Sequence, residues 1–94
     1  MDVEWDEAKD AENRRKHGLA LADAAGHDWE AAVAEPDLRF DYGETRWRVR
    51  APLEGRLHVC IFTLRNGRRR IISLRTANLR ERRSYGNRRK TSAD

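Results

Sequence analysis

The sequence has little cysteine, little proline and no long apolar run, and each shortage excludes a class of protein. Its 94 residues include one cysteine, Cys60, and two prolines. A single thiol cannot close an internal disulfide, and there is no zinc-type cluster of Cys and His, so we expect a protein of the reducing cytoplasm. No apolar run approaches the ~20 residues of a membrane-spanning helix. The acidic opening MDVEWDEAKD lacks the apolar stretch of a secretory signal, and we expect no membrane partner.

Acidic residues are scarce in the second half of the chain. Residues 1–44 carry thirteen acidic and five basic residues, whereas residues 45–94 carry three and fifteen. Seventeen of the twenty basic residues are arginines, whose planar guanidinium binds phosphate oxygens in pairs and stacks on bases. An arginine-rich codon usage would explain the excess of arginine over lysine but not the missing acids. The asymmetry therefore predicts a polyanionic partner.

The length fits one domain, which we place at residues 1–86, followed by a basic tail at 87–94. In the first half, residues 3–5 are typical of a short strand. Asp6 is a candidate N-cap for a helix that runs to about His17 and ends at Gly18. A short helix fits 20–25, residues 30–35 allow helix or strand with strand favoured, and 36–44 form a loop.

The second half predicts three strands and a helix. Residues 45–51 alternate apolar and arginine side chains, 57–65 and 68–76 are apolar enough for strands, and Asn66-Gly67 and Glu54-Gly55 are two-residue hairpin turns. The last helix begins near 77–78 and is expected to end at Gly86.

Two-residue turns fix the pairing of the strands. The Asn66-Gly67 turn places Thr63 opposite Arg70, Ile61 opposite Ile72 and His58 opposite Arg75. The Glu54-Gly55 turn places Val49 opposite Cys60 and Trp47 opposite Phe62. One face then forms the core, through the rows Trp47–Phe62–Ile71 and Val49–Cys60–Ser73.

The opposite face is expected to carry the row Arg46–Thr63–Arg70, with Arg48, Arg50, Arg65 and Arg68 around an apolar floor of Val59, Ile61, Ile72 and Leu74. In this register His58 and Arg75 lie on the other face and reach the row only at a sheet edge. The row has two interpretations: an anion-binding site, or a solvated face neutralised by acids such as Asp6, Asp10 and Glu12.

Several segments together resemble one family. They are Val-Glu-Trp-Asp-Glu-Ala-Lys at 3–9, Asn13 with Lys-His-Gly at 16–18, residues 39–44 followed by Arg46, and Arg-Ile-Ile-Ser-Leu-Arg at 70–75 with Ala77, Asn78, Glu81, Arg82, Arg83 and Tyr85. This pattern, over residues 3–85, is similar to the BrnT toxins of type II toxin–antitoxin systems.

The resemblance implies an α+β, RelE-like fold: an antiparallel sheet with N-terminal helices on one face and a C-terminal helix. It also implies a ribonuclease that arrests growth by cutting RNA. Its partner would be a BrnA-type antitoxin, through which alone it would meet operator DNA.

RNA cleavage without a metal or other cofactor would proceed by attack of the ribose 2′-OH on the adjacent phosphate. We expect Arg46, Arg70 and Arg75 to hold the phosphate charge. The candidates for proton transfer are Glu44, His17, His58, Glu81 and Tyr85, of which Glu44 and His58 complete the predicted catalytic group. Arg48, Arg50, Arg65, Arg68, Arg82 and Arg83 are the predicted RNA contacts. No Asp/Glu/His triplet has the spacing of metal ligands.

Two other functions fit the same charge pattern. A non-catalytic nucleic-acid-binding module would bind RNA in a salt-dependent way and leave it intact. A protein-interaction partner would use the basic face to dock an acidic protein.

Overall fold

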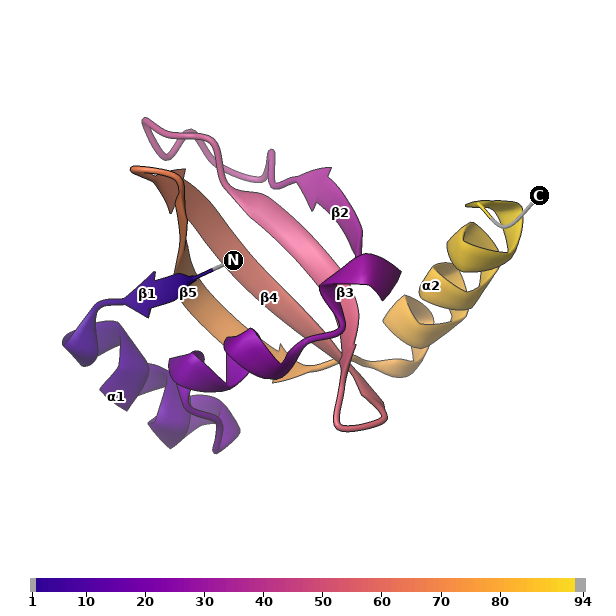
Figure 1. Cartoon of the computed structure of the whole chain (residues 1–94), viewed down its shortest axis with the longest axis horizontal. Coiled ribbons are helices and arrows are strands. Elements are labelled where there is room, and N and C mark those ends of the chain that lie inside the picture. The colour runs from indigo at the N-terminus through magenta and orange to yellow at the C-terminus, as the bar shows by residue number, and fades with distance from the viewer. Residues whose placement is uncertain (1, 93–94) are drawn as a thin grey trace.

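Five strands form a single mixed sheet in the order β1-β5-β4-β3-β2 (Figure 1). The computed structural model describes residues 2–92, with side chains to residue 87. The strands are β1 (Val3–Trp5), β2 (Val33–Pro36), β3 (Trp47–Leu53), β4 (Arg56–Arg65) and β5 (Arg68–Thr76). The helices are α1 (Glu7–His17) and α2 (Leu79–Ser92), and two 3₁₀ segments are η1 (Leu21–Gly26) and η2 (Trp29–Ala31). The predicted α+β class is confirmed.

One strand departs from the expected antiparallel sheet. β1 pairs with β5 in parallel, with Glu4 beside Arg70 and Trp5 beside Ile71. No hairpin joins β1 to another strand, because α1 follows it directly. β1 lies at one edge of the sheet, beside β5, which is the last strand in the sequence. The expectation of a wholly antiparallel sheet is therefore wrong for β1.

The caps predicted for α1 are confirmed. The Asp6 carboxylate accepts a hydrogen bond from the Lys9 N–H at 3.0 Å. At the other end Gly18 adopts φ 71°, and its N–H donates to the Arg14 carbonyl. These two residues set the length of α1, because one satisfies an orphan N–H and the other leaves the helix in a left-handed conformation.

Both predicted hairpin turns are present. Glu54 and Asn66 have φ 52°, and the glycines that follow them, Gly55 and Gly67, have φ 76° and 75°, as a turn with two left-handed residues requires. The predicted pairing of β3 with β4 is confirmed, including Val49 with Cys60. So is the pairing of Thr63 with Arg70 in the outer part of the second hairpin.

A bulge in β5 changes the rest of that register. Phe62 pairs with Ile71 but Ile61 pairs with Ser73, so Ile72 has no partner on β4. The predicted pairs Ile61–Ile72 and His58–Arg75 are therefore wrong. Because side chains alternate along a strand, one extra residue moves every later side chain to the other face. Arg75, which pairs with Val59, thus comes to the face of Arg48 and Arg50.

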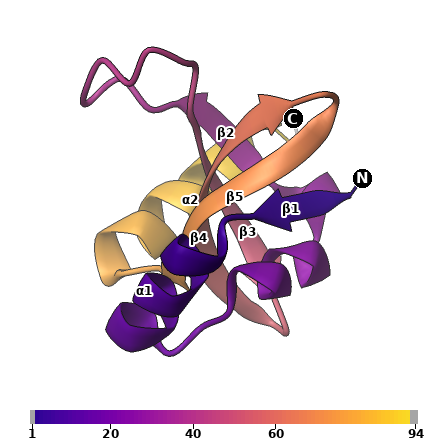
Figure 2. The same cartoon turned by 90° about the vertical axis from the view of Figure 1, so that its left-hand side faces the viewer.

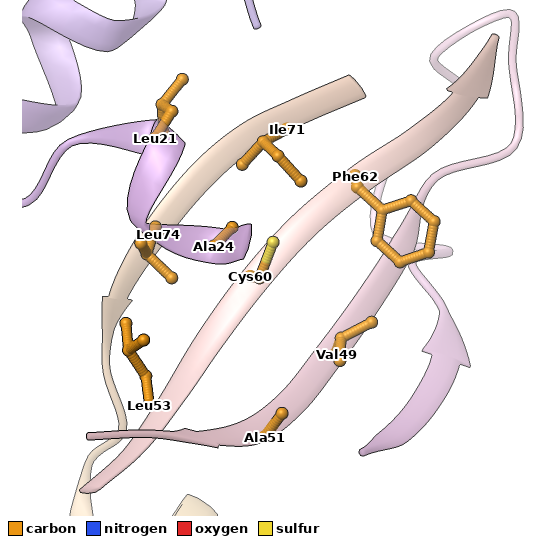
Figure 3. Close-up of a cluster of buried hydrophobic side chains, with 9 residues drawn as sticks. All are labelled: Leu21, Ala24, Val49, Ala51, Leu53, Cys60, Phe62, Ile71 and Leu74. Carbon is orange, nitrogen blue, oxygen red and sulfur yellow. The ribbon is translucent and has the colours of Figure 1, made fainter. Parts of the chain in front are cut away.

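The core occupies the face of the sheet that η1 covers (Figure 3). Leu21 and Ala24 of η1 lie over Cys60, Ile71 and Leu74, all of them fully buried. The bulge places Leu74 here in place of the predicted Ser73. Burial raises the pKa of the Cys60 thiol to about 12, so this cysteine is an unreactive core residue, as the sequence suggested.

The last helix is longer than predicted. α2 runs to Ser92 and passes through Gly86, so the predicted stop at Gly86 is wrong, and the boundary expected between domain and tail falls within a helix. Asn78 and Glu81 cap its start reciprocally: each accepts a hydrogen bond from the other's backbone N–H, at 2.8 and 3.0 Å. Figure 2 shows α2 on the side of the sheet opposite η1. Within residues 2–92, no helix is both long and apolar enough to cross a bilayer.

The burial of His27 is expected to make stability sensitive to mild acid. His27 lies 6.4 Å from His58 between ring centroids, and burial lowers the pKa of His27 below its usual 6.5. As pH falls through about 6.5, His27 is protonated in the unfolded chain but stays neutral in the folded chain. The free energy of unfolding therefore decreases as pH falls. We expect the thermal midpoint to drop between about pH 7 and pH 5, and to drop less in His27→Phe. The exposed His17→Gln variant should follow the original protein. A His27→Phe profile identical to that of the original chain would contradict this assignment.

Candidate nucleic-acid interface

The face of the sheet away from the core carries the arginines. Successive outward positions of β3 are Arg48 and Arg50, β5 contributes Arg70 and Arg75, and Arg46 directly precedes β3. Between them lie Val59 and Ile61, both buried, which form the predicted apolar floor. Two of the expected floor residues differ: Leu74 points into the core, and Ile72 is the bulged residue.

The Arg46–Thr63–Arg70 row is present at the end of the sheet where the β4–β5 turn lies. Thr63 pairs with Arg70, and its hydroxyl donates to the Thr45 carbonyl at 2.7 Å, next to Arg46. Arg70 of β5 and Arg46, just before β3, flank Thr63 from its two sides, with roughly 10 Å between their Cα atoms. Their side chains are 22% and 26% exposed. Two half-buried cations on one face of the sheet raise the local positive potential, which attracts an anion.

Carboxylates lie near both arginines at long range. Arg70 is 3.9 Å from Glu4 and 4.0 Å from Asp6, beyond hydrogen-bond reach. Arg46 is 3.4 Å from Glu44, which is also 3.4 Å from Arg65. Glu44 thus stands beside the row with a side chain 28% exposed, in a position to accept a proton from a molecule held there.

Of the three acids expected to neutralise the row, Asp6 lies 4.0 Å from Arg70, whereas Asp10 and Glu12 are engaged elsewhere. Asp10 accepts from the Leu21 N–H and the Arg14 side chain, and Glu12 pairs with neighbours on its own helix. The other acids near the row are Glu4 and Glu44. Glu4 was not identified from the sequence, because the parallel pairing of β1 with β5 has no local signal.

The other arginines of this face are occupied by α2 and β2. Arg48 binds Glu35 at 2.6 Å. Arg50, whose side chain is 6% exposed, donates to the Ser84 hydroxyl at 2.9 Å and lies 3.5 Å from Glu35. They line a cavity of about 400 Å³ together with Asn78, Arg80 and Glu81. Arg50 is therefore a structural contact between sheet and helix, not an open RNA contact.

Arg75 holds α2 to the sheet. Its guanidinium donates to both carboxylate oxygens of Glu81, at 2.7 and 2.8 Å. This pairing raises the pKa of Arg75 and lowers the pKa of Glu81 to about 2. The bulge thus brings Arg75 to the face of the arginine row and not, as predicted, to the opposite face. There it lies in the part covered by α2 and outside the Arg46–Thr63–Arg70 row.

The Arg75–Glu81 pair gives a direct test of how α2 is attached. Glu81→Gln should lower the free energy of unfolding by about 1 kcal/mol at neutral pH, a modest value because Arg75 is partly open to solvent. The carboxylate stabilises the fold above pH 4.5, and this contribution is lost as pH falls through about 2. The difference between variant and parent should therefore vanish in strong acid. Glu54→Gln, at an exposed turn, is the control, and equal losses in both variants would refute the role of the pair.

The remaining candidates lie apart from the row. His58 is 6% exposed on the core face, and its Nδ1 lies 2.8 Å from the Arg56 carbonyl. The Tyr85 hydroxyl donates to the Ala31 carbonyl at 2.6 Å, and His17 is exposed at the end of α1. The predicted RNA contacts that are exposed are Arg65, Arg68, Arg82 and Arg83. Among the residues described, no three His, Cys, Asp or Glu side chains are grouped to hold a metal ion.

A mixed five-stranded sheet with its core on one face and arginines on the other defines a small α+β protein with a cationic sheet surface. Residues 5–81 match the family model described as the ribonuclease toxin BrnT of type II toxin–antitoxin systems. The chain belongs to this family, and the resemblance predicted from its sequence is confirmed. Membership implies an RNA substrate and an antitoxin partner. A comparison with curated proteins gives no match.

Proposed function

We propose that this chain is a metal-independent endoribonuclease with a RelE-like fold, which arrests growth by cutting RNA in the cytoplasm. The observation that carries the proposal is the Arg46–Thr63–Arg70 row, which has two half-buried guanidinium groups on one sheet face. Arg46 makes one long contact with Glu44, at 3.4 Å, and Arg70 lies 3.9 Å or more from its carboxylate partners. Such a pair suits a phosphate, whose oxygens accept hydrogen bonds from both sides.

In the proposed reaction the ribose 2′-oxygen attacks the adjacent phosphorus. The new O2′–P bond forms as the P–O5′ bond breaks, so the products are a 2′,3′-cyclic phosphate and a 5′-hydroxyl. Arg46 and Arg70 stabilise the negative charge that gathers on the phosphorane oxygens. Glu44 accepts the 2′-OH proton, and water protonates the departing 5′-oxygen. Glu44 is the best placed of the proton-transfer candidates because it alone contacts Arg46.

The catalytic group proposed here is smaller than the one expected from the sequence. Arg75 acts through Glu81 to hold α2, and His58 lies across the sheet from the row. The exposed arginines Arg65, Arg68, Arg82 and Arg83 extend the cationic surface along the substrate. Their contribution should weaken as salt rises, because each phosphate contact releases a bound counterion.

The antitoxin partner is proposed to be of the BrnA type and to connect this chain to operator DNA. A BrnA-type protein that covers the row would neutralise the toxin by excluding RNA. An adjacent reading frame for a small DNA-binding protein would support this pairing.

Induced expression in bacteria, with growth and total RNA followed together, tests the proposal. We expect growth arrest with fragmented RNA, reversed by co-expression of the antitoxin, and cleavage by the purified chain in the presence of a chelator. Intact RNA with salt-dependent binding would instead identify a non-catalytic binding module. Cleavage that stops in chelator would overturn metal independence.

A further inference from the structure

A buried carboxylate, that of Asp37, accepts hydrogen bonds from other residues of the loop that joins β2 to β3. The side chain of Asp37 is 1% exposed and accepts two hydrogen bonds from the Arg39 guanidinium, both at 2.9 Å. It also accepts one from the Tyr42 hydroxyl at 3.2 Å. The Asp37 N–H donates to the Arg46 carbonyl at 2.7 Å, which closes the loop. These contacts lower the pKa of Asp37 far below its usual value, so the carboxylate stays charged and the loop keeps its shape at neutral pH.

This anchor positions an aromatic pair beside the arginine row. The Arg46 guanidinium lies over the Tyr42 ring, 3.9 Å from its centroid. The Phe40 ring meets Tyr42 edge-on, with the centroids 5.8 Å apart and the planes at 74°. Phe40, Tyr42 and Arg46 therefore form one continuous run from the loop to the row. Figure 1 shows this loop at the same end of the sheet as the β4–β5 turn, and the Glu44–Arg65 ion pair connects the two.

The outer member of the run is uncovered. Phe40 is 68% exposed, and Leu38 in the same loop is 85% exposed, the two highest values among the large apolar side chains of the described region. The hydrogen bonds that hold the loop are made by Asp37 with Arg39 and Tyr42, and the Phe40 ring adds only its edge-on contact with Tyr42. A rigid ring presented to solvent beside a cation is suited to binding something flat.

We infer that Phe40 is a stacking platform for an unpaired nucleobase of the RNA whose phosphate lies at Arg46. The inference rests on the proposed function in taking RNA as the ligand. Proteins that bind single strands combine a cationic groove for the backbone with aromatic rings that stack on the bases. Here the cation is Arg46 and the ring is Phe40, with Tyr42 between them. The site therefore selects single-stranded RNA, since a base within a duplex cannot reach the Phe40 ring.

Binding to a strand that cannot be cut separates this site from catalysis. The probe is a short 2′-O-methyl oligoadenylate, compared by fluorescence anisotropy with an abasic oligomer of equal length and charge. We expect Phe40→Ala to weaken binding of the oligoadenylate about five- to a hundredfold, the range measured for loss of one base–aromatic stack. The abasic oligomer should bind both proteins equally. The slope of affinity against salt should stay unchanged, because no phosphate contact is lost.

Leu38→Ala is the matched control, because Leu38 is an exposed apolar residue in the same loop without an aromatic ring. It should change oligoadenylate affinity less than twofold. Equal weakening by both variants, or weakening of the abasic oligomer by Phe40→Ala, would overturn the stacking site. So would unchanged RNA binding in both variants with loss of antitoxin binding, which would assign the loop to a protein partner. Absence of RNA cleavage with base-dependent binding retained would refute the ribonuclease proposal and leave this one standing.

Discussion

Arg70→Ala is expected to lower the rate of RNA cleavage by about a hundred- to a thousandfold, the usual effect of removing one group that stabilises developing oxyanion charge. The side chain of Arg70, on β5, is 26% exposed. Its two ion-pair partners, Glu4 and Asp6, lie beyond hydrogen-bond distance. Its charge is therefore available to a phosphate. The fold should survive, because Arg70 contributes only long-range pairs with Glu4 and Asp6. Cleavage of a labelled RNA in chelator, followed at saturating protein, measures the effect.

The control for this loss is Arg56→Ala. Arg56 is exposed at the opposite end of the sheet, so the variant makes the same change in net charge away from the row. We expect cleavage at the original rate. If Arg56→Ala and Arg70→Ala slow cleavage equally, net charge and not the row explains the activity. A normal rate in Arg70→Ala would remove Arg70 from the catalytic group.

Asn13→Ala is expected to cost about 2–5 kcal/mol of folding free energy, because three backbone groups lose their hydrogen bonds to this side chain. Asn13 is 4% exposed. Its amide nitrogen donates to the Leu74 and Leu19 carbonyls, both at 2.9 Å, and its oxygen accepts from the Leu74 N–H at 3.0 Å. The pairing of β1 with β5 ends at Ile71. Beyond that point the Asn13 side chain forms the hydrogen bonds to the Leu74 backbone that a neighbouring strand would otherwise form.

Chemical denaturation at neutral pH measures the cost. Asn13→Asp is informative beside Asn13→Ala, because it keeps the acceptor for the Leu74 N–H but removes both donated hydrogen bonds. Arg15→Ala, on the exposed face of α1, should change stability by less than about 0.5 kcal/mol. A loss in Asn13→Ala no larger than that in Arg15→Ala would show that water replaces the amide, and would refute its structural role.

Local signals in the sequence were enough to predict most of the fold. Asp6 and Gly18 specify where α1 begins and ends, and the dipeptides Glu54-Gly55 and Asn66-Gly67 specify the turns, so the register near each turn follows from alternation. The bulge at Ile72 could not be predicted in this way. It lies inside an apolar strand with no turn signal. The contacts that favour it are tertiary, because the bulge buries Leu74 in the core and brings Arg75 to Glu81.

The candidate site was predictable to the extent that it depends on turn geometry. The row Arg46–Thr63–Arg70 follows from the two hairpins, and the structure has it. The partners of the arginines were not predictable, because Glu4 and Glu35 come from edge strands that join the sheet by long-range pairing. The burial of Arg50 also depends on α2, through its contact with Ser84. The arginine-rich sequence of α2 does not indicate which face of the sheet this helix covers.

In the proposed reaction the substrate's own 2′-hydroxyl breaks the chain at a phosphate held by Arg46 and Arg70. A single 2′-deoxy substitution at a mapped cleavage position tests it most directly, with the purified protein in chelator and the products analysed at their ends. We expect no cleavage at that position, normal cleavage elsewhere, and 2′,3′-cyclic phosphate ends on the unmodified strand. Cleavage of the deoxy-substituted position at the normal rate would contradict it.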